Sequence, residues 1–222
     1  MTLPSLLPYY VNIALIALAW GCSVPVAKRQ DRNVRFMSHL LGITAIIELA
    51  SLIYAKRYHN NMPIYAVFNP VNCMLTCFYF NEAIDVFRRR HVGFIIGIVS
   101  LAVGITNLVF LQPINHLNNY YLFFEGILII SLSLLSYTRL TLAQYNNEKD
   151  VPLYHNLHFW IASILTFFWT TTFLSWGLYE FLSVKSPASM WLINLLIITV
   201  NIITYGSFSI LFLAFRKMQP CP

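Results

Sequence analysis

The chain has 222 residues, of which 58% are hydrophobic and only 10% are charged, and its mean hydropathy is +0.65. A soluble domain carries about 25% charged residues because its surface faces water, so the composition excludes that class and predicts an integral membrane protein. The net charge of +6 comes from basic residues at the ends of apolar segments, which indicates orientation in a membrane rather than binding to nucleic acid.

Seven segments are long and apolar enough to cross a bilayer, which takes about 20 residues per helix. We expect helices because lipid cannot hydrogen-bond the backbone and because the alternation typical of barrel strands is missing. The segments are roughly 6–27, 36–57, 63–87, 92–111, 118–144, 157–182 and 189–215. The first lacks a preceding basic region, so we expect it to stay as a helix rather than to be removed as a signal peptide. Short loops leave residues 1–222 as a single all-α domain, a seven-transmembrane-helix bundle.

The basic residues predict the orientation of this bundle, because cytoplasmic loops are enriched in Lys and Arg. One side of the membrane holds 11 of the 14 basic residues: Lys28, Arg29, Arg32, Arg35, Arg88, Arg89, Arg90, Arg139, Lys149, Arg216 and Lys217. The other side holds Lys56, Arg57 and Lys185. We therefore expect a multi-pass protein of the cell membrane with its N-terminus outside and its C-terminus in the cytoplasm.

Two glutamates, Glu48 and Glu125, lie within predicted spans with no Lys or Arg at a similar depth. An ionisable side chain inside a membrane is costly and therefore marks a candidate functional site. Such a carboxyl group is expected to be neutral or to await a cationic partner. Both residues fall in the outer half of the bundle, where they are predicted to anchor the polar or cationic group of a ligand.

Four asparagines at a comparable depth, Asn69, Asn72, Asn107 and Asn194, are predicted to orient the same ligand in one outward-facing cavity. The alternative is that each amide only hydrogen-bonds a neighbouring helix, as such side chains often do in membranes. Pro70 lies inside the third segment, where it removes a backbone donor and is expected to act as a conformational hinge.

The cytoplasmic end carries a basic cluster, Arg88, Arg89 and Arg90, which follows Glu82 and Asp85 at helical spacing. Ion pairs between residues three or four apart are therefore available. We expect a solvated helix end that could dock a cytoplasmic partner. The GxxxG pattern of Gly93 and Gly97 favours close helix packing, either within the bundle or in a dimer.

Two well-known chemistries of seven-helix proteins are disfavoured. Retinal proteins need a Schiff-base lysine in the last helix, and no lysine lies between Met190 and Phe215. Zinc hydrolases of the ceramidase and progestin-receptor type place a histidine ligand in that helix, which has none. We expect no retinal, no metal and no other cofactor, although four histidines near the cytoplasmic boundary keep a zinc hydrolase as an alternative.

Several short motifs resemble small bacterial seven-transmembrane-helix proteins with no assigned ligand. They are Glu48-Leu49, Phe68-Asn69-Pro70, the helix around Glu125 and the run from His158 to Ser163. Some proteins of this kind are associated with sensor kinases, so the resemblance implies a sensory or accessory role.

The sequence thus predicts a membrane sensor or receptor-like protein that binds a small ligand and signals through a separate cytoplasmic or membrane partner. A proton-coupled small-molecule transporter is the alternative, because uncompensated carboxyl groups suit proton coupling.

Overall fold

The computed structural model describes residues 3–29, 32–115, 118–145, 153–183 and 187–218. This part of the chain contains helices and no strand. The α-helices are α1 (Leu3–Arg29), α2 (Arg32–Tyr58), α3 (Met62–Ala83), α4 (Asp85–Arg90), α5 (Val92–Thr106), α6 (Asn119–Tyr145), α7 (Leu157–Ser183) and α8 (Pro187–Met218). A π-helical turn, η1 (Asn107–Leu111), continues α5, and a short 3₁₀ turn, η2 (Leu153–His155), precedes α7.

Among the described residues, six helices are long and apolar enough to cross a membrane. Their apolar spans are Leu7–Lys28, Val34–Tyr58, Val92–Leu111, Asn119–Tyr145, Leu157–Ser175 and Leu192–Lys217. The chain is therefore an all-α, multi-pass membrane protein. The seven segments expected from the sequence agree with the long helices to within four residues at either end, when η1 is counted as the continuation of α5.

The segment expected at 63–87 is interrupted near its C-terminal end, since α3 stops at Ala83 and α4 begins at Asp85. Ile84 has an extended backbone (φ −109°, ψ 108°) and separates α3 from the short α4. The turn is held from inside, because the side-chain oxygen of buried Asn81 accepts a hydrogen bond from the backbone of Gly93 at 3.0 Å. In α4, Arg88 pairs with Asp85 at 3.3 Å, as the spacing predicted. Glu82 instead accepts a hydrogen bond from Asn81.

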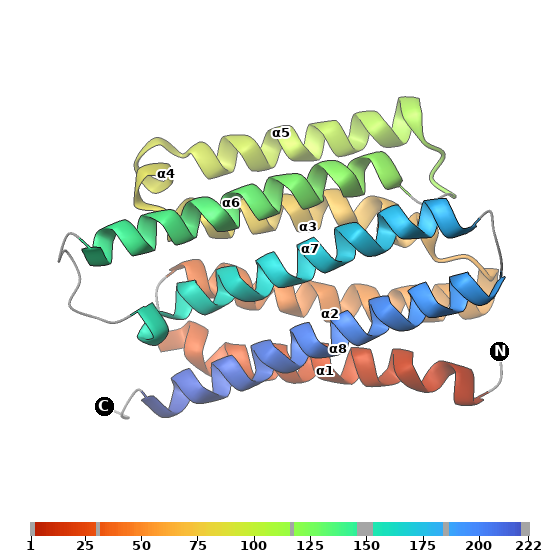
Figure 1. Cartoon of the computed structure of the whole chain (residues 1–222), viewed down its shortest axis with the longest axis horizontal. Helices are drawn as coiled ribbons and strands as arrows, with labels where there is room; N and C mark the ends of the chain where they lie inside the picture. The colour runs from red at the N-terminus through yellow and green to blue at the C-terminus, as the bar shows by residue number, and fades with distance from the viewer. Residues whose placement is uncertain (1–2, 30–31, 116–117, 146–152, 184–186, 219–222) are drawn as a thin grey trace.

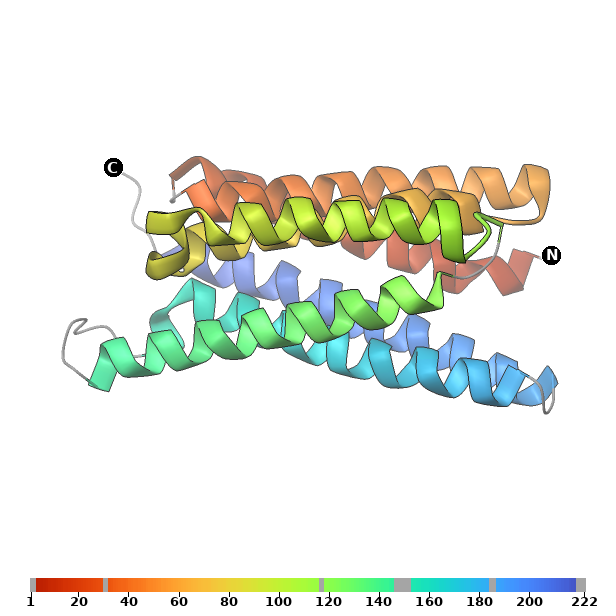
Figure 2. The ribbon, with the colours of Figure 1, turned by 90° about the horizontal axis from the view of Figure 1, so that it is seen from above.

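Six helices form a closed ring, in the order α1, α2, α3, α6, α7 and α8, with α8 packed back against α1. The helices run nearly parallel or antiparallel to one another in both views (Figures 1 and 2). The remaining long helix, α5, packs mainly against α3 and lies at the edge of the bundle (Figure 1). The interior of the ring is therefore built without α5.

Glycines bring α5 against α3. A Cβ atom on Gly93 would lie 2.5 Å from the Cβ of Asn81, and one on Gly104 would lie 2.5 Å from Cγ of Pro70. Real atoms cannot approach so closely, so only glycine fits at these two contacts. The small-residue pattern of α5 is thus used for packing within the chain.

The two ends of the bundle differ. The N-terminal end of α1 lies at one end, whereas α4 and the C-terminal ends of α6 and α8 lie at the other (Figure 1). Near the α4 end the ring is filled by fully buried side chains, including Val34, Phe80, Ile161 and Phe212. These side chains form a packed core at the α4 end of the ring.

Candidate ligand-binding cavity

A cavity of about 330 Å³ lies inside the ring. Its volume is at the lower end of the range of small-molecule pockets, roughly 300–1,000 Å³. Side chains from all six ring helices line it, and α5 contributes none. The lining extends from Asn61 and Met62, at the connection of α2 to α3, to Met37, Leu41 and Phe208 of the buried core. The cavity therefore reaches the end of the bundle where α2 turns into α3 and is closed at its other end by core side chains.

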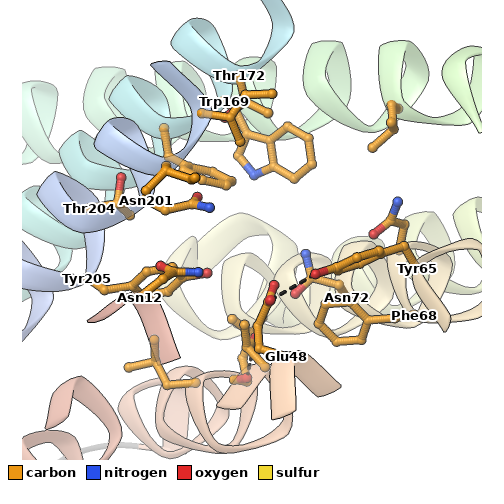
Figure 3. A pocket seen from close by; sticks show the side chains of 18 of the residues that line it. Asn12, Glu48, Tyr65, Phe68, Asn72, Trp169, Thr172, Asn201, Thr204 and Tyr205 are labelled. Carbon is orange, nitrogen blue, oxygen red and sulfur yellow. Dashed lines mark hydrogen bonds between the residues drawn. The ribbon is translucent and has the colours of Figure 1, made fainter. Parts of the chain in front are cut away.

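Four of the six predicted ligand-binding residues line this cavity: Glu48, Asn69, Asn72 and Asn194. They come from α2, α3 and α8, so residues distant in the sequence meet around one space. Asn194 is exposed, which places it at the edge of the cavity rather than deep inside. The close-up view shows Glu48, Tyr65 and Asn72 on one side and Trp169 and Thr172 on the other (Figure 3).

Glu48 is the residue on which the electrostatics of the cavity depend. Tyr65 donates a hydrogen bond from its hydroxyl group to Oε2 of Glu48 at 2.8 Å. The lining residues that the structure describes include no Lys, Arg or His. Among these residues, the carboxyl group of Glu48 therefore has no cationic partner in the cavity wall.

Glu125 lies in α6 and is fully buried, but it is not part of the cavity wall. Its Oε1 accepts a hydrogen bond from Nδ2 of Asn72 at 3.3 Å, and Oε2 has no partner among the described residues. The expectation that Glu125 contacts the ligand directly does not fit this geometry. Asn72 stands between the carboxyl group and the cavity.

Asn107 also lies away from the cavity, which corrects the expectation that it orients the ligand. It begins the π-helical turn η1, where its backbone oxygen accepts a hydrogen bond from Gln112. Its side-chain amide donates to Asn118 and to Gln112. Asn107 lies outside the ring, and its amide nitrogen joins η1 to Asn118, which precedes α6. Its side-chain Oδ1 is buried without a partner among the described residues.

The predicted hinge, Pro70, lies within continuous helix α3, where it is buried against Gly104 of α5. Its hinge function stays a prediction. The predicted cytoplasmic face, Arg88, Arg89 and Arg90, is exposed on α4.

The cavity-lining residues of α7 were not predicted from the sequence. Phe168, Trp169 and Thr172 line the cavity on that helix, and their spacing places them on one face. Tyr65 of α3 and Asn201 and Tyr205 of α8 also line the cavity. Their spacing from Asn69 and Asn194 places them on the same helix faces as those asparagines. Two further polar residues that were not predicted, Asn12 of α1 and Thr204 of α8, also belong to the cavity wall. Both are buried lining residues, and Oδ1 of Asn12 and Oγ1 of Thr204 have no hydrogen-bond partner in the described part of the chain.

Within the described residues there is no group of three or more His, Cys, Asp or Glu side chains that could hold a metal ion. The zinc-hydrolase alternative therefore gains no ligand set from this part of the chain. Comparisons with protein families, with curated proteins and with solved structures find no match to this chain.

Proposed function

We propose that this chain is a sensor or receptor-like protein of the cell membrane, which binds a small ligand in the ring cavity and signals through a separate partner. The observation that carries the proposal is Glu48, whose carboxyl group lines a cavity of about 330 Å³ and has no cationic partner among the described residues. A carboxyl group at membrane depth is costly unless it serves a function. A purely structural bundle would be close-packed at this position.

The proposal includes seven membrane spans, with α3 as the seventh. Its 22 residues are about 33 Å long, enough to cross the hydrocarbon core of roughly 30 Å. It packs against the apolar helices α2, α5 and α6, and its polar face lines the cavity with Tyr65, Asn69 and Asn72. Inward-facing polar groups account for a lower overall hydropathy without exposing them to lipid.

The proposed orientation has the N-terminus outside and α4 in the cytoplasm. The basic ends of α4 and α8 lie at the same end of the bundle (Figure 1), which supports a cytoplasmic location by the positive-inside rule. With this orientation, the cavity lies toward the outside. Ligand binding would shift α3 around Pro70 and so move the exposed arginines of α4, to which a partner would respond.

The binding step is testable with a library of small polar molecules, screened by thermal unfolding of the purified protein in lipid nanodiscs. We expect compounds that raise the unfolding temperature of the wild-type protein. Thr172→Phe should abolish this response, because the added ring occupies the cavity. Thr170 is exposed two residues away on α7, so Thr170→Phe makes the same change outside the cavity and should leave the response intact.

Two results would contradict the binding proposal. One is a library with no stabilising compound. The other is a Thr172→Phe protein that is stabilised as strongly as the wild type, since binding would then take place outside the ring.

A proton-coupled transporter is the second candidate. It is favoured by the link from the cavity through Asn72 to Glu125, which places a second carboxyl group within one hydrogen bond of the wall. Proteoliposomes whose internal buffer has a different pH from the external solution would distinguish the two functions. A transporter accumulates a stabilising compound in response to the pH gradient, whereas a receptor binds it without net uptake.

A further inference from the structure

The chemistry of the cavity wall restricts the class of ligand. Glu48 is the only Asp, Glu, Lys, Arg or His among the lining residues that the structure describes. An anionic ligand would meet this carboxyl group with no positive charge to compensate it. A cation would supply the partner that the wall lacks, since a buried charge needs a counter-charge.

Aromatic side chains surround much of the same space. Phe68 and Tyr65 lie on α3, Phe168 and Trp169 on α7, and Tyr205 and Phe208 on α8. Trp169 lies across the cavity from Glu48 and Tyr65 (Figure 3). Aromatic faces attract cations, and most strongly those with alkyl groups on nitrogen, which lose little on leaving water.

A bare metal ion is a poorer match to this wall. Hard cations such as Ca²⁺ take six to eight oxygen ligands, often from several carboxylates. The described wall offers a single carboxyl group among apolar and aromatic side chains. It also offers neutral acceptors, because Oδ1 of Asn12 and Oγ1 of Thr204 lack partners in the described part of the chain.

We propose that the cavity binds a small organic ammonium ion, whose positive charge lies against Glu48 and whose alkyl groups contact the aromatic wall. This inference rests on the proposed function, because it names the ligand class of the same cavity. The volume of about 330 Å³ limits the ligand to a small molecule.

The test compares charged and uncharged molecules of the same shape. Choline, tetramethylammonium and n-butylammonium chlorides are titrated into the full-length protein in nanodiscs. The uncharged control is 3,3-dimethyl-1-butanol, in which a carbon atom replaces the nitrogen of choline. Sodium chloride at equal concentration controls for ionic strength. We expect at least one ammonium ion to raise the unfolding temperature with a midpoint about tenfold or more below that of the uncharged molecule.

Glu48→Gln should remove this preference, since the amide keeps an acceptor for Tyr65 but carries no charge. Glu82→Gln is the control. It makes the same exchange near the C-terminal end of α3, outside the cavity, and should keep the preference for the charged molecule. Tyr65→Phe provides a second variant that retains the carboxyl group. It should also keep the preference for the charged molecule.

The outcomes separate this inference from the proposed function. If uncharged or anionic library compounds bind and Thr172→Phe abolishes their binding, the cavity is a ligand site but the ammonium assignment is wrong. Equal responses to sodium and to the ammonium salts, or an unchanged preference in Glu48→Gln, also overturn the assignment. If no compound of any class binds, both proposals fail.

Discussion

The amide of Asn72 joins the cavity to a carboxyl group that the cavity does not reach, by donating a hydrogen bond to Glu125 at 3.3 Å. Asn72 lies on the cavity wall in α3, and Glu125 is fully buried in α6. This hydrogen bond joins α3 to α6, and both of these helices also contact α5. It makes the Asn72–Glu125 pair a measurable element of bundle stability.

Asn72→Val is expected to destabilise the protein by about 1–2 kcal/mol, because it leaves the buried carboxyl group of Glu125 without its hydrogen-bond donor. Glu125→Gln should cost less, since the amide oxygen can accept the same bond. The measurement is the free energy of unfolding in mixed micelles. A larger loss in Glu125→Gln than in Asn72→Val would show that the carboxyl group has a different main partner.

Gly93→Ala is expected to weaken the contact of α5 with α3 by about 1–3 kcal/mol, because the new methyl group would overlap Asn81. Gly21→Ala is the matched control. A Cβ atom on Gly21 meets nothing within 4 Å, and alanine favours a helix over glycine by about 0.5–1 kcal/mol. Thermal unfolding should therefore show a lower midpoint for Gly93→Ala and an equal or higher one for Gly21→Ala. Equal midpoints below the wild type for both would rule out the tight contact at Gly93.

The proposed orientation predicts which exposed positions react from outside the cell. In a background with the native cysteines replaced, Arg57→Cys should react with a membrane-impermeant maleimide in intact cells. Arg89→Cys should react only after the membrane is permeabilised. Both side chains are exposed, and they flank α3 in the chain: Arg57 lies at the end of α2, just before α3, and Arg89 lies in α4, just after it. The reverse pattern would invert the topology, and reaction of both positions from one side would mean that α3 does not span the membrane.

The proposed hinge predicts that ligand binding moves α4 relative to α8. Spin labels at Arg89→Cys in α4 and Lys217→Cys near the C-terminal end of α8 would report the distance between these two helices. Both positions are exposed. A stabilising compound should change this distance in the wild-type background. Pro70→Ala restores a backbone donor to α3 and should reduce the change. A distance that does not respond to the compound in either background would remove the proposed signalling route.

Much of the secondary structure was predictable because it depends on local properties. A run of apolar residues in lipid must form a helix to satisfy its backbone, so the ranges 118–144 and 157–182 agree with α6 and α7. The break after Ala83 was not visible in the same way. It depends on the hydrogen bond between Asn81 of α3 and Gly93 of α5, and a contact between two helices cannot be read from the hydropathy of either one.

By itself the sequence determined that the chain is helical and membrane-embedded, because hydropathy and length act locally along each helix. It also identified Glu48, Asn69, Asn72 and Asn194, whose polar groups need partners at membrane depth. Only the tertiary structure decided which polar residues share a cavity. It placed Asn107 outside the ring because glycines pack α5 against the outer side of α3, placed Glu125 behind Asn72, and brought Trp169 and Thr172 into the wall. Depth in the membrane follows from position in the chain, whereas the neighbours of a side chain follow from how whole helices pack.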